Sequence, residues 1–284
     1  MSKTKIITDS GCDIPLDLIK KYNIEIVSLT VRFGQEEVVD TISLSAKEFW
    51  AKFQSSTAGS MPETAAPSPG NFIKAFNKAI EEGFENIICI CISSKVSSTY
   101  ESAINAANEI SENVNIKVVD SLSVSIGEGL IVVDAAKAAL DNQPLEAIID
   151  LINHNISNHV VMGAIDNLET LKRTGRISSS KALVGSLLSI KPVVELKDGK
   201  VENESNQRTR TKSLDYVIDK AAAIKKIKLF SILNGEAKDY ETFKSKMLER
   251  VDIAEGVEII EADIGPIIGS HVGQGAVGFA CLTE

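Results

Sequence analysis

The segment GSHVGQG near the end of the sequence places one histidine, His271, among glycines. An imidazole donates or accepts hydrogen bonds and can carry a proton near neutral pH, so it often serves in binding and catalysis. Because glycines widen the choice of backbone conformations, we expect His271 to lie on a shaped loop that comes close to a ligand. The other two histidines, His154 and His159, have no metal-ligand pattern around them. His271 is therefore the first candidate site residue, and an exposed histidine without a function is the alternative.

Hydroxyl groups gather in the segment ISSKVSSTYESA, where a strand-like run is predicted to end and a helix to begin. Ser93 and Ser97 lie in the loop, and Ser98 and Glu101 have the spacing of a capping box. The N-terminus of a helix carries unpaired N–H groups and a partial positive charge, which favour a carboxylate or a phosphate. The segment therefore predicts an anion site with Ser93 and Ser97 as candidate ligands. Plain capping of the helix by Ser97 or Ser98 is the alternative.

Thr64 and two basic clusters complete the set of candidate polar groups. Thr64 lies in the segment MPETAAPSPGNF, just before another predicted helix. Loops of this kind meet beyond the carboxyl ends of the strands of an α/β sheet, which would bring Thr64 toward the serine loop; the alternative is a linker. The clusters LKRTGRISSS and NQRTRTK supply Arg173, Arg176, Arg208 and Arg210. Taken singly, such arginines belong more often to a solvated face than to a site.

The composition excludes several classes of protein. With 284 residues, 44% of them hydrophobic and 24% charged, the sequence is typical of a globular protein with one or two domains. The net charge of −9 argues against nucleic-acid binding, because phosphates would be repelled. No apolar run approaches the ~18 residues of a membrane span, and the start MSKTKIITDSGCD lacks the apolar core of a secretory signal. We therefore expect a cytoplasmic protein without a membrane span.

Motifs that define a metal or a nucleotide site are missing from the sequence. The four cysteines form no CxxC pair and no zinc pattern, and Cys89 and Cys91 alternate along a strand-like run as small hydrophobic residues. The sequence contains no P-loop, no GxSxG motif and no HExxH motif. We therefore expect neither a metal nor a cofactor.

The elements that must position these groups alternate in the first half of the sequence, which is typical of a parallel α/β layer. Strands are predicted at 3–9, 24–33, 85–93 and 115–121, and helices at 15–23, 43–54, 71–83, 97–113, 123–142 and 144–155. Ser45 and Glu48 have capping-box spacing at the second of these helices. Residues 55–71 are rich in Ser, Pro, Gly and Ala, and they predict a long loop.

The order of the elements changes after about residue 157. Strands are predicted near 159–165, 190–196, 199–204, 227–233, 257–262 and 276–282, and helices near 211–225 and 238–250. The Asp-Gly pair in LKDGK predicts a hairpin between two of these strands. We therefore predict two α/β domains: an N-terminal domain at 1–157 with a parallel sheet, and a C-terminal domain at 158–284 with a mixed or antiparallel sheet.

An ordered series of motifs runs along the whole sequence: TDSGCDIP, MPETAAPSPGNF, ISSKVSSTYESA, VVDS, LETLKRTGRIS, KPVVELKDGKV, RTRTK and IGSHVGQGAVGF. Together they resemble the DegV family of bacterial fatty-acid-binding proteins. That family includes the binding subunits that present a fatty acid to a separate fatty-acid kinase. The resemblance implies the two-domain DegV fold for this chain.

In that family a threonine of the second motif and a serine of the third bind the fatty-acid carboxylate, which implies this role for Thr64 and Ser97. The resemblance also implies that His271 lies at the domain junction near the carboxylate and that Arg208 contacts the kinase. The sequence departs from the family pattern in having TAAP for TSQP, SST for SGT and HVGQG for HVGPG. Because Thr64, Ser97 and His271 are retained, these departures concern the groups around the carboxylate site and the acyl preference.

The sequence therefore predicts a carrier without catalytic residues. A long-chain fatty acid such as palmitate or oleate would lie in a buried tunnel, and an ATP-dependent kinase subunit would modify its carboxyl group. Two alternatives stay open: an acyl hydrolase in which His271 activates Ser97, and a sugar-binding protein that uses the histidine, suggested by distant kinship with dihydroxyacetone kinases. The preferred chain length and saturation, the oligomeric state, the identity of the kinase and the surroundings of Arg173 and Arg208 also stay open.

Overall fold

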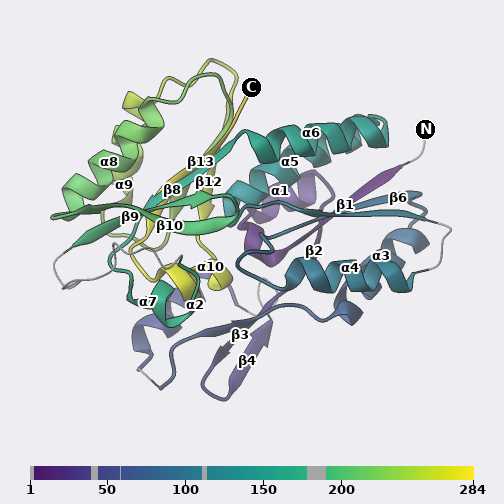
Figure 1. The fold of residues 1–284 in the computed structure, drawn as a ribbon, viewed down its shortest axis with the longest axis horizontal. Helices are drawn as coiled ribbons and strands as arrows, with labels where there is room; N and C mark the ends of the chain where they lie inside the picture. Colours follow the sequence, from purple (N-terminus) through teal and green to yellow (C-terminus); the bar gives the residue numbers. More distant parts are fainter. Residues whose placement is uncertain (1–2, 40–43, 58, 111–113, 178–189) are drawn as a thin grey trace.

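The structure is a computed structural model, and it describes residues 3–39, 44–57, 59–110, 114–177 and 190–284. Within these ranges the strands form three sheets. Figure 1 shows the parallel sheet on the right, a larger mixed sheet on the left and a small sheet at the bottom. The predicted fold class is confirmed, because a parallel-sheet α/β region precedes a mixed-sheet α/β region along the chain.

The N-terminal region is built on a parallel sheet, which in the described residues has the strand order β2-β1-β6-β7. Its strands are β1 (Thr4–Asp9), β2 (Glu25–Val27), β6 (Asn86–Cys91) and β7 (Asn115–Asp120). β1 and β6 are buried along their whole length because helices cover both faces of the sheet. One face packs against α3 (Pro69–Glu81) and α4 (Thr99–Glu109), and the other packs against α5 (Ile126–Leu140). Cys89 and Cys91 are buried together on the α3–α4 face, as predicted.

The C-terminal region of the described chain is built on a sheet with the order β10-β9-β8-β13-β11-β12. Its strands are β8 (His159–Ala164), β9 (Lys191–Lys197), β10 (Lys200–Gln207), β11 (Ile227–Asn234), β12 (Glu258–Asp263) and β13 (Val277–Thr283). β11 and β12 are parallel, and the other neighbouring strands are antiparallel. One face is covered by α8 (Arg210–Ala222) and α9 (Tyr240–Arg250), and the other packs toward α5. The predicted hairpin between β9 and β10 is confirmed, with Asp198 and Gly199 both at positive φ in its turn.

A small antiparallel sheet, β4-β3-β5, is one part of the fold that the sequence does not predict. Its strands are β3 (Thr30–Phe33), β4 (Glu36–Val39) and β5 (Glu63–Ala65). The single strand predicted at 24–33 is wrong, because its first part is β2 in the parallel sheet and its second part is β3. The loop predicted at 55–71 is wrong in part, because it contains β5 and the start of α3. β5 has only three residues and pairs with a strand far along the chain, which local sequence does not reveal.

A short helix replaces the loop predicted around His271. This helix, α10 (Pro266–Val272), begins at a proline, and His271 lies in its last turn. Gly269 is needed for close packing and not for a loop conformation. A Cβ at this position would lie 2.5 Å from Cε1 of Phe49. Phe49 belongs to α2 (Ala46–Ser55), where the predicted capping box between Ser45 and Glu48 is present. Gly269 therefore lets α10 pack closely on α2, whereas Gly273 and Gly275 follow the helix at positive φ.

The remaining described elements are η1 (Ser10–Cys12), α1 (Leu16–Lys21), α6 (Leu145–Ser157) and α7 (Glu169–Arg173). The predicted domain boundary between residues 157 and 158 stays a prediction. Three predicted features lie outside the described residues: the start of the 43–54 helix, the end of the 97–113 helix and the last residue of LETLKRTGRIS.

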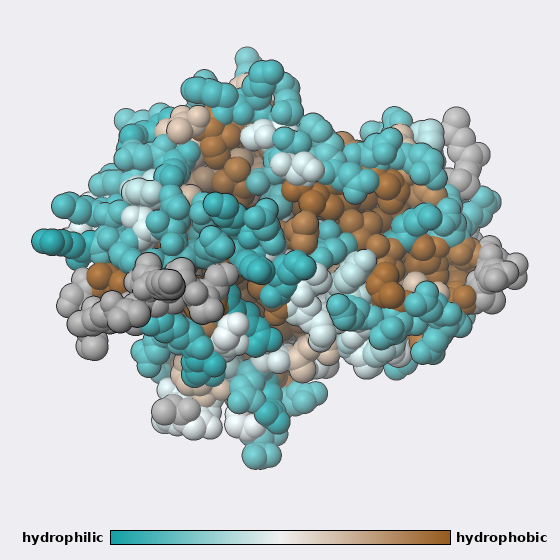
Figure 2. All heavy atoms as spheres, viewed as in Figure 1, coloured by the Kyte–Doolittle hydropathy of each residue, from teal (hydrophilic) through white to brown (hydrophobic). Residues whose placement is uncertain are grey.

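The surface in view is mostly hydrophilic, and apolar residues show through in separate patches (Figure 2). Four large apolar side chains of the described residues are strongly exposed, and Leu16, at 62%, is the most exposed of them. No helix in the described ranges is long and apolar enough to cross a bilayer.

Candidate functional site

A cavity of about 320 Å³ lies where the N-terminal and C-terminal regions meet. Its walls come from the end of β5, the loop between β6 and α4, the turn after α7, and α10. Five polar side chains line it: Thr64, Ser97, Ser98, Arg176 and His271. Three of the four predicted ligand-binding residues, Thr64, Ser97 and His271, are thus brought to one cavity from distant parts of the sequence.

Thr64 and His271 are in direct contact in this cavity. Oγ1 of Thr64 and Nε2 of His271 are hydrogen-bonded at 3.0 Å, across 207 residues of sequence. Nδ1 of His271 is buried and has no hydrogen-bond partner among the described residues. A buried ring nitrogen without a partner is costly, and the described side chains leave this one unsatisfied.

Burial, followed by the nearby positive charges of Arg176 and Arg173, lowers the pKa of His271 to about 4. The imidazole is therefore neutral at pH 7, with one N–H donor and one acceptor. A bound anion would act in the opposite direction and raise this pKa, because it favours the protonated ring.

Ser97 lies at the N-terminus of α4, on the wall of the cavity. Its Oγ accepts a hydrogen bond from the backbone N–H of Thr99 at 3.3 Å and is hydrogen-bonded to Oγ1 of Thr99 at 2.8 Å. The predicted capping box of Ser98 and Glu101 is absent, because the Ser98 side chain makes no capping hydrogen bond. Ser97 therefore serves this helix end and also faces the cavity.

Ser93 does not line this cavity. Its side chain is fully buried, and its Oγ donates to the backbone carbonyl of Gly199 at 2.7 Å and accepts from the N–H of Lys95 at 3.2 Å. A Cβ at position 199 would lie 2.6 Å from this Oγ, so a glycine allows the close approach. In this structure Ser93 thus joins the tip of the β9–β10 hairpin to the serine loop.

Three of the four arginines in the basic clusters differ in their surroundings. Arg176 lines the cavity, and its guanidinium donates to the backbone carbonyls of Val96 and Thr174. Arg173 donates to the carbonyl of Pro62 at 3.4 Å and lies outside the lining. Arg208 is exposed and also lies outside it. The sequence indicates the cluster that contains Arg176 but not this residue in particular, because spacing alone does not show which arginine faces inward.

A second cavity of about 70 Å³ continues the first. The two share four apolar lining residues: Val124, Val201, Ile268 and Val272. The second cavity is lined mainly by apolar residues of β8, β9 and β13 on the face of the mixed sheet that packs toward α5. The combined space therefore has polar groups at one end and an apolar lining at the other. This distribution of polarity matches that of an amphiphilic ligand.

The hydrogen bonds of Ser97 and His271 do not form the catalytic arrangement that the hydrolase alternative requires. Nε2 of His271 is hydrogen-bonded to Thr64, and Oγ of Ser97 is hydrogen-bonded to Thr99. No carboxylate orients Nδ1 of His271 among the described residues, whereas a serine nucleophile needs a histidine base held by a third group. The apolar lining also disfavours a sugar, whose hydroxyls would lose their hydrogen bonds.

The fold and the cavity define an α/β protein with two main sheets. At the junction of the sheets lies a pocket that is polar at one end and apolar at the other. A profile of the family described as "Uncharacterised protein, DegV family" matches residues 3–284. This chain belongs to the DegV family.

Relatives of known sequence or structure match the chain along its whole length. It is 30% identical over 281 residues to a DegV domain-containing protein of Staphylococcus aureus, covering 97% of this chain and 96% of the relative. It is also 30% identical over 280 residues to a DegV domain-containing protein of Listeria innocua, covering 97% of each chain.

A solved structure described as "Fatty Acid Binding of a DegV family Protein from Thermus thermophilus" is 29% identical, with a TM-score of 0.87 and coverage of 99% of this chain and 100% of that chain. A stearic-acid-binding protein from Eubacterium ventriosum shares the fold at 24% identity, with a TM-score of 0.89 and coverage of 99% and 98%. These similarities agree with the fold described above.

Proposed function

We propose that this protein binds a long-chain fatty acid such as palmitate or oleate. The carboxylate of the fatty acid would lie near four side chains: Thr64, Ser97, His271 and Arg176. The acyl chain would occupy the apolar space between the two main sheets. The observation that carries this proposal is the gathering of hydroxyl, imidazole and guanidinium groups at one end of a cavity whose continuation is apolar. The Thermus thermophilus relative described as fatty-acid-binding supports the same ligand class.

The physical chemistry of the ligand fits this division of the cavity. A carboxylate is best held by several convergent donors, and charge-assisted hydrogen bonds to it are the stronger ones. Burial of each methylene contributes about 0.8 kcal/mol before ordering costs, so a long acyl chain supplies most of the affinity. The polar end would then select for a carboxylate and fix its orientation.

We further propose that the protein is a carrier that does not itself catalyse a reaction. The carboxyl group would be modified by a separate ATP-dependent kinase, which implies a cytoplasmic role, and no cofactor is needed for binding. Exposed Arg208 is the proposed contact with this partner. If so, Arg208→Ala leaves fatty-acid affinity unchanged and reduces phosphorylation of the bound acid by the kinase. A loss of fatty-acid affinity in this variant would instead place Arg208 in ligand binding.

The proposed ligand is tested by native mass spectrometry of protein purified from a bacterial host, followed by extraction and identification of the bound lipid. We expect a fatty acid at close to one per chain, and delipidated protein that binds added palmitate in calorimetry. Protein that carries no fatty acid and takes up none when loaded would refute the proposal. An ester-hydrolysis assay run in parallel tests the alternative, which requires turnover that depends on both Ser97 and His271.

A further inference from the structure

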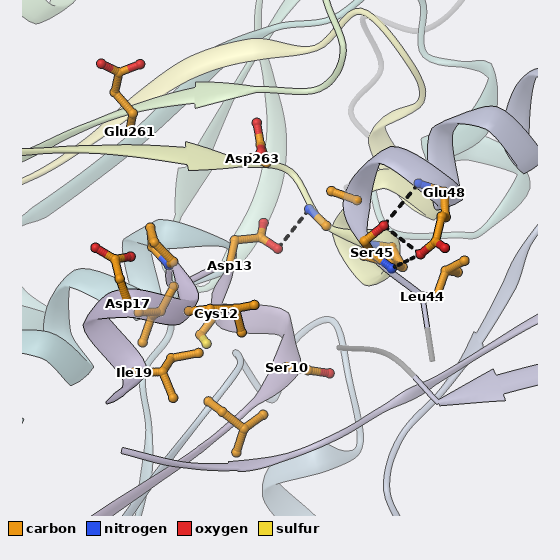
Figure 3. Close-up of a pocket in the computed structure, with 17 residues that line it drawn as sticks. Ser10, Cys12, Asp13, Asp17, Ile19, Leu44, Ser45, Glu48, Glu261 and Asp263 are labelled. Carbon is orange, nitrogen blue, oxygen red and sulfur yellow. Dashed lines mark hydrogen bonds between the residues drawn. The ribbon is translucent and has the colours of Figure 1, made fainter. Parts of the chain in front are cut away.

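A further cavity in the described residues is separate from the proposed fatty-acid pocket. It has a volume of about 650 Å³ and lies between α1, the start of α2 and the turn from β12 to α10. Figure 3 shows the carboxylates of Asp13, Asp17, Glu48, Glu261 and Asp263 around it. It shares no lining residue with either cavity of the fatty-acid pocket. We refer to it as the acidic cleft.

The floor of the acidic cleft is apolar. Ile14, Ile19, Ile26, Leu44 and Pro266 line it, together with Leu16 at its edge. Leu16 is 62% exposed, which makes it the most exposed large apolar side chain among the described residues. A leucine in this position favours contact with another molecule, since its exposed surface gains from being covered.

The rim of the cleft is negatively charged. Five carboxylates line the cleft, and no lysine, arginine or histidine is among its lining residues. Asp13 accepts hydrogen bonds from Oγ of Ser125 and from the N–H of Gly265, and Glu261 pairs with Lys244. Asp17 and Asp263 have no hydrogen-bond or ion-pair partner in the described part of the chain. Burial raises the pKa of Asp263, and neighbouring Glu236 and Glu261 raise it further, as expected where negative charges crowd together.

We propose that the acidic cleft is a docking site for a partner protein that inserts a lysine or arginine side chain flanked by apolar residues. The aliphatic stem of such a side chain would cover the apolar floor while its charged end meets the rim carboxylates. A divalent metal is a poorer occupant, because the described residues include no group of three side chains placed to hold one. A small amine would neutralise the rim but leave Leu16 uncovered, so the charge and the exposed leucine together favour a protein segment.

The position of the cleft gives a docked partner access to the helix that carries His271. Gly265 and Pro266, at the start of α10, line the acidic cleft, and His271, one helix length further on, lines the fatty-acid pocket. Asp13 of the TDSGCDIP motif holds the start of this helix through its hydrogen bond to Gly265 at 3.0 Å. A partner in the cleft would therefore contact both regions of the molecule and the base of α10.

The test uses a synthetic peptide, acetyl-Leu-Lys-Leu-Arg-Leu-amide, and a neutral analogue with norleucine and citrulline at the charged positions. Binding to the wild type is followed by amide chemical shifts in NMR and by titration at low and high salt. We expect the basic peptide to shift amides of α1, the start of α2 and the β12–α10 turn, and to bind more weakly as salt is added. The neutral analogue should bind more weakly than the basic peptide at low salt.

Matched double variants separate the cleft from general attraction to an acidic protein. Asp17→Asn with Asp263→Asn should weaken peptide binding by about tenfold, the effect of two partly exposed charge pairs. Glu146→Gln with Asp150→Asn removes the same charge from exposed positions on α6 and should leave binding unchanged. Equal affinity for the two double variants, or a peptide that moves no cleft amide, would overturn the proposal. Hexylamine binding as tightly as the peptide would also overturn it, because the cleft would then be a small-amine site.

Discussion

The neutral imidazole of His271 makes stability depend on pH in a defined direction. Its pKa of about 4 in the folded protein lies below the ordinary value of 6.5, so the unfolded chain binds more protons between these values. The stability that His271 contributes is present above pH 6.5 and is lost as the pH falls toward 4. The shift corresponds to a loss on the order of 3 kcal/mol.

This prediction is checked by urea unfolding of delipidated wild type and His271→Asn between pH 7 and pH 4.5. The free energy of unfolding should fall more steeply for the wild type as the pH is lowered. Asp9 works in the opposite direction, because burial raises its pKa to about 6, but it is present in both proteins and cancels in the comparison. Parallel curves for the two proteins would contradict the assignment of a buried neutral imidazole.

Thr64 and Ser97 should each contribute to fatty-acid affinity only through a hydrogen bond to the carboxylate of the ligand. Thr64→Ala or Ser97→Ala is expected to weaken palmitate binding by about 1–3 kcal/mol, the range for a hydrogen bond to a charged group. Calorimetry of delipidated protein measures the change, and circular dichroism checks that the fold is kept. Ser55→Ala on the exposed end of α2 is the control and should bind like the wild type. Unchanged affinity in both site variants would move the carboxylate elsewhere.

The sequence predicts some of the residues that line the pocket but not all of them. His271, Thr64 and Ser97 were selected from their types, their loops and the family resemblance, and the structure brings them to one cavity. Ser93 is predicted from its type and its loop alone, but its hydroxyl donates to the carbonyl of Gly199, 106 residues away. Which serine of a run faces inward depends on such distant contacts, and the same holds for Arg176.

Among the elements, α10 depends on close packing at one position. In Gly269→Ala the added Cβ would lie 2.5 Å from Cε1 of Phe49 and 2.9 Å from Cη2 of Trp50, so this aromatic pair has to shift. We expect destabilisation of about 1–3 kcal/mol, as for overpacked cores, together with weaker fatty-acid binding because His271 lies in the same helix. Urea unfolding and palmitate calorimetry measure the two effects. Gly59→Ala, with no atom within 4 Å of the new Cβ, is the control.

Long, periodic elements were predicted well, and elements that depend on tertiary contacts were not. Runs of apolar residues indicate the buried strands of both regions, and apolar residues at helical spacing indicate the amphipathic helices. β5 has three residues and exists because it pairs with β3, and α10 is a short helix rich in residues that usually signal a loop. β5 carries Thr64 and α10 carries His271, so these two site residues are predicted by type although the elements that hold them are not.

At the scale of the whole molecule, the proposed ligand would lie between its two regions and should stabilise them together. Binding adds RT ln(1 + [L]/Kd) to stability, which is about 2.7 kcal/mol at a ligand concentration of 100 Kd. Palmitate should therefore raise the melting temperature of delipidated protein in differential scanning calorimetry, and octanoate should raise it less. Methyl palmitate has the same chain without a carboxylate and serves as the control for the polar end. A shift as large for octanoate as for palmitate would argue against burial of the acyl chain.

The central place of β13 has a consequence for the time course of synthesis. β13 lies between β8 and β11, and both are made before it. Until β13 leaves the ribosome, the facing edges of these two strands have no neighbour, and unpaired edges of this kind can join other chains. The mixed sheet therefore closes late, while every strand of the parallel sheet is already available. In this interval the nascent chain carries the described strands of the parallel sheet while the mixed sheet still has open edges.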